Sequence, residues 1–100
     1  MVRGGYVYLT TTRKNTTLYV GSTSELKARI YQHKNKTYPN AFTARYNVDK
    51  LVYYEGFLSI EEALAREHQI KSWRREKKIA LINKFNPEWK DLYDEISDWE

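Results

Sequence analysis

The chain has 100 residues, no cysteine, and 17 Lys and Arg against 13 Asp and Glu, which gives a net charge of +4. This length suits one small domain, and the lack of cysteine excludes disulfides, thiolate metal sites and a cysteine nucleophile. No apolar run approaches the roughly 20 residues that span a bilayer, and the first residues form no apolar signal region, so we expect a cytoplasmic protein without membrane contact.

The charges are divided unevenly along the chain. From Pro87 onward there are six carboxylates and one lysine, so the preceding part carries 16 Lys and Arg against 7 Asp and Glu, a balance of +9. A basic body favours phosphate-rich partners through counterion release, although a solubilising surface has the same composition. We expect one domain at residues 1–86, with an acidic tail or short helix at 87–100 packed on it.

Two short strands are predicted first, at residues 6–9 and 18–21, because aliphatic and aromatic side chains alternate along both runs. A helix is predicted to follow, over about residues 24–35. Arg29 and His33 are four residues apart in this helix and therefore share one of its faces. Polar groups from the strands and from the helix are expected to converge on one pocket.

The connection between the two strands leaves their register conditional. If the turn is centred between Arg13 and Lys14, Tyr8 lies opposite Tyr19 on the same face of the sheet. Arg-Lys is not a favoured two-residue turn, however. Asn15 tolerates a positive φ and provides the bend if the loop is longer.

Residues 50–56 read as a third strand, preceded by a possible helical turn near residues 41–46. In regular alternation, Leu51 and Tyr53 would share one face of this strand, with Val52 and Tyr54 on the other. The two tyrosines are interpreted as ordinary sheet-packing residues.

A second long helix is predicted over about residues 60–73, and Ser59 with Glu62 matches a capping box at its start. Its apolar residues recur at helical spacing, and Glu67 falls within this inward stripe. A buried carboxylate is costly without a partner. Glu67 therefore pairs with a core arginine, lies at the edge of the stripe, or binds a divalent cation.

A third helix is predicted to end at about Lys84, after a basic cluster around Trp73. Basic residues interleaved with an aromatic suit nucleic-acid backbone contacts, although such a run is often only a solvated face. Trp73 is interpreted as a packing residue. The predicted fold is α/β (α+β), a small, mainly antiparallel three-stranded sheet flanked by helices in the order β-β-α-β-α-α.

Several segments together resemble the GIY-YIG nuclease superfamily. They lie in the expected order: Gly5-Tyr6-Val7-Tyr8, Tyr19-Val20-Gly21, Arg29 with His33, residues 62–67 and residues 86–89. Tyr6 departs from the pattern, because it occupies the position of the first glycine of the family name. The chain is most similar to the small single-domain, URI-type branch, which is related to the N-terminal domain of the excision-repair nuclease subunit.

The resemblance implies a catalytic role for two tyrosines, an arginine, a histidine and a glutamate. Tyr8 or Tyr19 acts as general base, and the resemblance leaves open which one. His33 orients or deprotonates that tyrosine, and Arg29 stabilises charge on the phosphate. Glu67 is the implied ligand of Mg²⁺ or Mn²⁺, since one carboxylate with water and substrate oxygens can hold such an ion.

Further residues are candidates for DNA contacts or for support of the site. The candidates for contacts with the DNA backbone are basic: Lys27, Arg45, Lys71, Arg74, Arg75 and Lys78. Gly21 and Asn86 are candidates for site support, with Asn83 as the alternative to Asn86.

The sequence thus predicts a metal-dependent DNA endonuclease acting in DNA repair or recombination, with a protein partner for targeting. One alternative is a nucleic-acid-binding module of the same fold that does not cut. Another is a protein-interaction domain whose acidic tail docks a basic partner. An inward glutamate favours the nuclease, because a pure binding module has no need of it.

Overall fold

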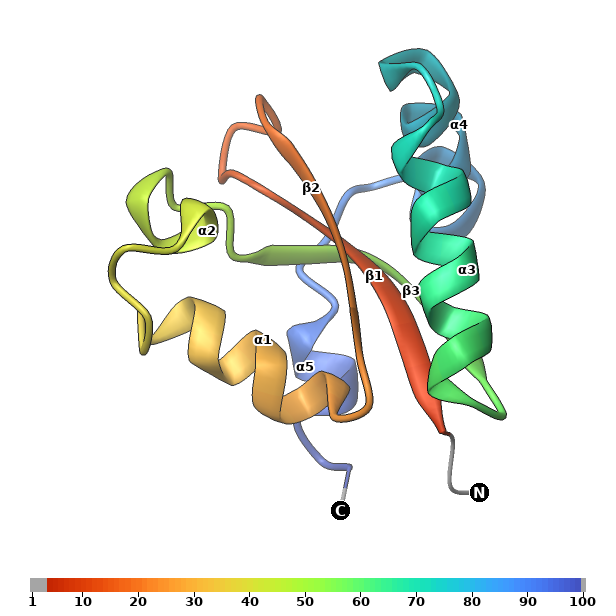
Figure 1. Ribbon diagram of the computed structural model, residues 1–100. Coiled ribbons are helices and arrows are strands. Elements are labelled where there is room, and N and C mark those ends of the chain that lie inside the picture. Colours follow the sequence, from red (N-terminus) through yellow and green to blue (C-terminus); the bar gives the residue numbers. More distant parts are fainter. Residues whose placement is uncertain (1–3, 100) are drawn as a thin grey trace.

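The computed structural model describes residues 4–99, which form a three-stranded antiparallel sheet with helices on both sides (Figure 1). The elements are β1 (Gly5–Thr11), β2 (Leu18–Thr23), α1 (Leu26–Lys34), α2 (Phe42–Arg45), β3 (Lys50–Phe57), α3 (Ile60–Lys71), α4 (Arg75–Phe85) and α5 (Tyr93–Ile96). The predicted fold class and the order β-β-α-β-α-α are confirmed, with the short helices α2 and α5 in addition. No helix within the described range has the length and apolar character needed to cross a membrane.

β1 is the central strand of the sheet, and β2 forms one edge. Tyr8 pairs with Gly21 and Thr10 pairs with Tyr19, so the register with Tyr8 opposite Tyr19 is wrong by two residues. The reason is the longer loop, in which Asn15 adopts a φ of 61°. A shift of two residues preserves the side of the sheet, so Tyr8 and Tyr19 still share a face, with ring centroids 6.3 Å apart.

β3 contains a bulge that changes which side chains share a face. Leu9 pairs with Tyr53 and Thr10 with Leu51, which leaves Val52 as an extra residue between them. Val52 and Tyr53 therefore join the same hydrophobic cluster, while Leu51 belongs to the cluster on the opposite face. The expected alternation along this strand was wrong because a bulge shifts the side-chain pattern by one residue.

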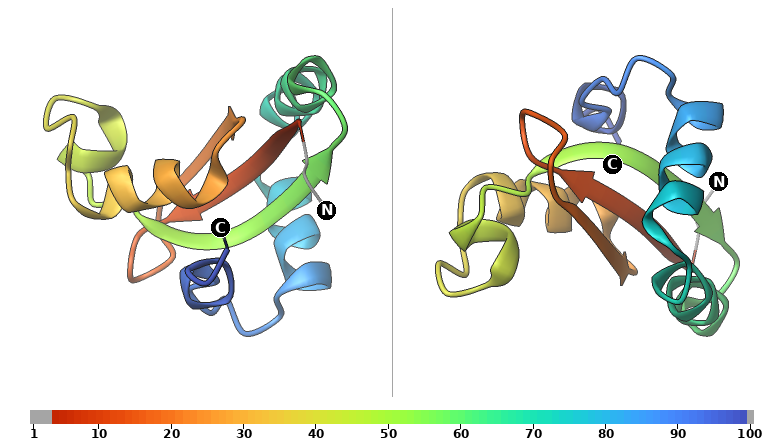
Figure 2. Two further views of the ribbon diagram at one scale, coloured as in Figure 1. Left: turned by 90° about the horizontal axis from the view of Figure 1, so that it is seen from below. Right: turned by 90° about the horizontal axis from the view of Figure 1, so that it is seen from above.

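The two faces of the sheet carry separate cores. On one face, aliphatic residues of all three strands pack against Ile70 of α3 and Ile82 of α4. On the other face, Tyr8 packs with Leu26 and Ile30 of α1 and with buried residues from the C-terminal segment. In both views of Figure 2 the strands run between α1 and α2 on one side and α3 on the other.

The capping box predicted at the start of α3 is confirmed for its serine, whereas the carboxylate of Glu62 accepts a hydrogen bond from the Ser59 hydroxyl and not from the Ser59 backbone N–H. Ser59 is the N-cap residue, and its Oγ accepts a hydrogen bond of 3.2 Å from the backbone N–H of Glu62. Glu67 lies on the buried side of the helix, with 9% of the residue exposed, whereas Leu64 is 43% exposed. α3 therefore presents Ala63, Glu67 and Ile70 to the sheet.

Candidate active site

A chain of hydrogen bonds links the central strand to α1 and α2. The hydroxyl of Tyr8 lies 3.0 Å from Nε2 of His33, and Nδ1 of His33 lies 2.7 Å from the hydroxyl oxygen of Thr43. Tyr8 and Thr43 are 1% and 3% exposed. Both nitrogens of the imidazole thus have a partner, and the ring orientation is fixed from two sides. Sequence reasoning did not single out Thr43, although it lies in the expected helical turn near residues 41–46 and in a run, residues 42–47, that resembles a segment beside the active site of the family.

The surroundings keep the side chains of Tyr8 and His33 neutral. Burial lowers the pKa of His33 to about 4, and the positive charge of Arg29 acts in the same direction against a smaller opposing effect of Asp49. Burial also raises the pKa of Tyr8 above its ordinary value, helped by Tyr19 and opposed by Arg29. At pH 7 the phenol therefore carries its proton, and the imidazole has one N–H and one free lone pair. In this state the phenol can donate its hydrogen bond to the lone pair of Nε2, while Nδ1–H donates to Thr43.

Gly21 is required by the close approach of the Tyr8 ring. A Cβ at this position would lie 2.5 Å from Oη and 2.6 Å from Cζ of Tyr8, and 3.0 Å from Cε2 of Tyr19. Such a Cβ would overlap the tyrosine side chain. The structure thus gives a steric reason for glycine beside the two tyrosines.

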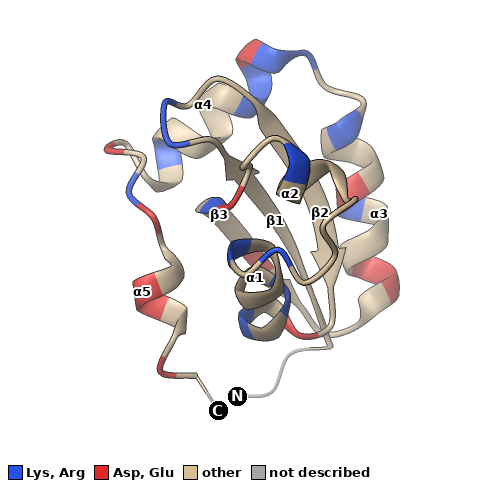
Figure 3. Cartoon of the chain, turned by 90° about the vertical axis from the view of Figure 1, so that its left-hand side faces the viewer, with Lys and Arg blue, Asp and Glu red and all other residues tan. Residues whose placement is uncertain are grey.

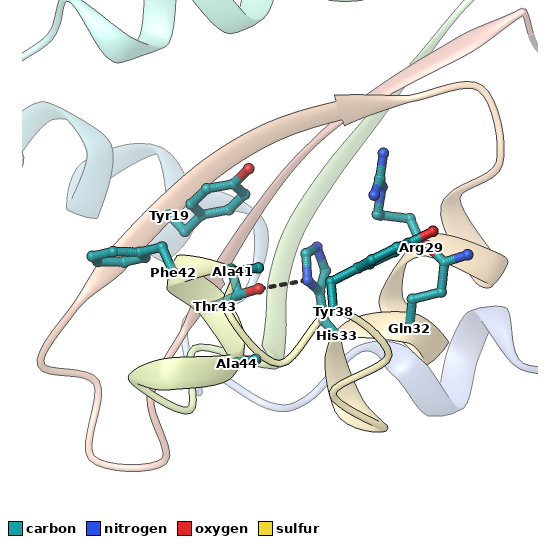
Figure 4. A pocket seen from close by; sticks show the side chains of 9 residues that line it. All are labelled: Tyr19, Arg29, Gln32, His33, Tyr38, Ala41, Phe42, Thr43 and Ala44. Atoms are coloured by element: carbon teal, nitrogen blue, oxygen red, sulfur yellow. Dashed lines mark hydrogen bonds between the residues drawn. The ribbon is translucent and has the colours of Figure 1, made fainter.

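Beside the hydrogen-bonded residues Tyr8, His33 and Thr43 lies a cavity of about 330 Å³ between α1, α2 and β2 (Figure 4). Its lining residues are Tyr19, Arg29, Gln32, His33, Tyr38, Ala41, Phe42, Thr43 and Ala44. None of them is acidic. Across residues 4–99, no carboxylate lies within ion-pair distance of the Arg29 guanidinium. The cavity therefore offers a positive charge to an anion.

Glu67 lies on the other side of the edge strand, on α3. It forms a short hydrogen bond with the hydroxyl of Ser22 in β2, and its Oε2 lies 2.5 Å from Nζ of Lys71. Burial alone would raise the pKa of Glu67, but the hydrogen bonds from Lys71 and Ser22 outweigh it and hold the pKa below its ordinary value. The carboxylate is thus ionised, and its charge contributes to the raised pKa of Tyr8. Ser22 was missed by the sequence reasoning, and no core arginine of residues 4–99 pairs with Glu67.

The donor set around Glu67 fits a hard divalent cation held by one carboxylate. Within residues 4–99 no three His, Asp or Glu side chains come together as a metal cluster. Mg²⁺ often binds through one or two carboxylates and keeps several waters, so one ionised glutamate is sufficient. The ammonium of Lys71 already provides positive charge at Oε2, and the side chain of Lys71 is 51% exposed.

None of the predicted DNA-contacting residues is among the residues that line the cavity. Lys27 donates from Nζ to the carbonyl oxygen of Trp99 at 2.7 Å, and Arg75 donates to the carbonyl oxygen of Thr16 at 3.0 Å. Arg45 lies over the ring of Tyr46 on α2. The remaining three belong to the basic region where α3 ends and α4 begins, visible in Figure 3: Lys71, Arg74 and Lys78.

The aromatic and asparagine residues near the end of the domain have structural partners. The half-buried ring of Trp73 packs on one core and has Arg66 and Lys77 over it, at 5.2 and 4.4 Å from the ring centroid. Asn86 is 6% exposed; its Nδ2 donates to the carbonyl oxygens of Val52 and Lys90, and its Oδ1 accepts from the N–H of Lys90.

Asn83 accepts a hydrogen bond from the indole of Trp89. Neither asparagine is hydrogen-bonded to the Tyr8–His33–Thr43 chain. Asn86 instead ties α4 to β3 and to the C-terminal segment.

Comparison with known proteins gives consistent results. A family model described as the GIY-YIG catalytic domain matches residues 4–80. A UPF0213 protein of Staphylococcus saprophyticus is 37% identical over 78 residues, which cover 78% of this chain and 93% of the relative. A UPF0213 protein of Clostridium perfringens is 40% identical over 78% of this chain and 82% of its own length.

A solved structure shows a similar fold. The solution NMR structure of the UPF0213 protein BH0048 from Bacillus halodurans matches with a TM-score of 0.55 and 26% identity, covering 87% of this chain and 90% of that one. The range matched by the family model contains Tyr8, Tyr19, Arg29, His33 and Glu67, and it ends before Asn86.

Proposed function

The chain belongs to the GIY-YIG catalytic-domain family, and from that premise we propose that it is a metal-dependent endonuclease that hydrolyses phosphodiester bonds in DNA. The observation that carries this proposal is the hydrogen bond between Tyr8 and a neutral His33, beside a cavity that exposes Arg29. DNA repair or recombination in the cytoplasm is the proposed setting, with a protein partner for targeting.

Tyr8 is assigned as the general base because its hydroxyl is bonded to a group that can take its proton. As the phenol oxygen accepts a proton from the attacking water, its own proton passes to Nε2 of His33. Nδ1 of His33 then carries the second proton of the imidazolium, and Thr43 accepts a hydrogen bond from it. Tyr19, half-buried on the wall of the cavity, is assigned to positioning the substrate.

Arg29 is assigned to the phosphate. Its guanidinium faces the cavity without a carboxylate partner in residues 4–99, so two of its N–H groups can bind two phosphate oxygens and stabilise the charge that develops during the reaction. A divalent ion on Glu67 would supply further charge neutralisation at the phosphate. Ser22 holds Oε1 of Glu67 in place for that role.

The test is cleavage of supercoiled plasmid and of branched DNA with Mg²⁺, with Mn²⁺ and with EDTA. Glu67→Gln keeps the shape of the side chain and removes its charge, and Glu61→Gln is the matched control because Glu61 is exposed on the same helix. We expect metal-dependent cleavage by the wild type and the control and none by folded Glu67→Gln. Binding of Mn²⁺, followed by electron paramagnetic resonance, should weaken in the same variant.

Two further variants test the assignment of the base. Tyr8→Phe should abolish cleavage, whereas Tyr19→Phe should retain a measurable rate because the Tyr8–His33 pair is intact. The opposite order of activities would transfer the role of base to Tyr19.

One observation favours a module that binds nucleic acid without cutting. Both oxygens of Glu67 already have protein partners, Ser22 and Lys71, so the carboxylate is satisfied without a metal. This alternative is supported if wild type and Glu67→Gln bind DNA equally and neither cuts it in any of the metal conditions.

A further inference from the structure

The cavity has aromatic walls that the catalytic assignment does not use. The ring of Phe42 stacks on that of Tyr19, with centroids 6.3 Å apart and planes at 23°. Figure 4 shows these two rings along one side of the cavity and Tyr38 on the other, with His33 between them. Tyr38 and Phe42 are 55% and 48% exposed, so both rings are open to a ligand that enters the cavity.

The exposed aromatic residues are concentrated in one part of the molecule. Seven large apolar side chains of residues 4–99 are exposed, and four of them are aromatic and fall within residues 31–46: Tyr31, Tyr38, Phe42 and Tyr46. Two of the four, Tyr38 and Phe42, line the cavity. Their exposed rings suit a flat apolar ligand.

The size and charge of the cavity restrict its occupant. Its volume of about 330 Å³ is at the lower end for sites that take small molecules, so it admits one ring system and excludes a duplex. Arg29 supplies a cation, Gln32 supplies an amide, and no acidic residue lines the walls. A nucleobase with its phosphate has the matching chemistry: apolar faces, a polar edge and an adjoining anion.

We propose that this cavity holds the base of an unpaired nucleotide, stacked between Tyr38 and the Phe42–Tyr19 pair while Arg29 binds the neighbouring phosphate. The inference rests on the proposed function in that it takes DNA as the ligand. A base in an intact duplex is paired and stacked on its neighbours and cannot enter, so the substrates selected are single strands, flaps and duplexes with an extrahelical nucleotide.

The test compares two duplexes of identical sequence, one with a single bulged nucleotide and one with an abasic residue at the same position. Affinities are measured by fluorescence anisotropy in EDTA, so that no cleavage occurs. The wild type should bind the bulged base about 5- to 150-fold more tightly than the abasic bulge, the range that stacking of one base provides. Phe42→Ala and Tyr38→Ala should reduce this ratio towards one.

Two control variants distinguish stacking in the cavity from the loss of an aromatic residue elsewhere on the surface. Phe42→Trp keeps an aromatic face and should retain the preference. Tyr31→Ala removes an exposed aromatic residue of α1 that does not line the cavity, and it should leave the ratio unchanged. Circular dichroism confirms that each variant is folded.

The inference is overturned if the wild type binds both bulges equally, or if Phe42→Ala weakens binding to both by the same factor. It is also overturned if no DNA is bound at low salt, the result expected of a protein-docking surface. A base preference that persists while no metal condition produces cleavage would refute the nuclease and retain the base-binding cavity. Cleavage without any base preference would refute the base-binding cavity and retain the nuclease.

Discussion

Gly21→Ala tests the packing of the site with one methyl group. The new Cβ would lie 2.5 Å from Oη and 2.6 Å from Cζ of Tyr8, so the ring has to move. That ring is 1% exposed and its hydroxyl is bonded to His33. Its displacement therefore disturbs the core and the hydrogen bond together.

Two effects of opposite sign determine the size of the change. Alanine in a strand is normally favoured over glycine by about 0.5–1 kcal/mol, because glycine loses more backbone entropy on folding. Overpacking of a filled core costs about 1–3 kcal/mol, and a lost hydrogen bond costs about 1 kcal/mol more. The free energy of unfolding of Gly21→Ala should therefore fall by about 1–3 kcal/mol.

The assay is urea unfolding followed by circular dichroism and tryptophan fluorescence, in the wild type and in a Tyr8→Leu background. Leucine lacks both crowded atoms of Tyr8, so the added methyl group should cost less there, with only the contact to Tyr19 remaining, and the difference between the two backgrounds isolates the contact with Tyr8. A Gly21→Ala protein as stable as the wild type, or more stable, would refute the steric account of this glycine.

Three further predictions concern stability. Ser59→Ala removes the N-cap of α3 and should lower the free energy of unfolding by about 1 kcal/mol in urea titrations. Asn86→Ala leaves backbone groups of Val52 and Lys90 without partners and should lower the free energy of unfolding by about 2–3 kcal/mol. The NMR resonances of His33 should stay in place in this variant. A large shift of those resonances would contradict the view that Asn86 only ties α4 to β3 and to the C-terminal segment. The folded pKa of His33, about 4, lies below its ordinary 6.5, so the unfolded chain binds an extra proton between these values and stability should fall as the pH drops through this window. The pH dependence of unfolding should be weaker in His33→Gln, and an NMR titration of His33 with a midpoint near 6.5 would refute the prediction.

The sequence alone determined the elements and much of the candidate site. Alternation of aliphatic and aromatic residues depends only on the geometry of one strand, so it predicted the strands and separated the aromatic from the aliphatic face of each. Helical spacing likewise placed Arg29 with His33 and turned Glu67 towards the sheet, and Ser59 marked the start of α3. These features are local, and a local pattern is sufficient to predict them.

The tertiary structure decided everything that depends on contacts between distant segments. The register of β1 and β2 follows from a loop whose length the residues do not specify, and the bulge at Val52 appears only when β3 pairs with β1. Hydrogen bonds between different segments place Thr43 beside His33 and Ser22 beside Glu67, and they tie Asn86 to β3. Periodicity describes which way a side chain points, whereas its partner depends on how the whole chain folds.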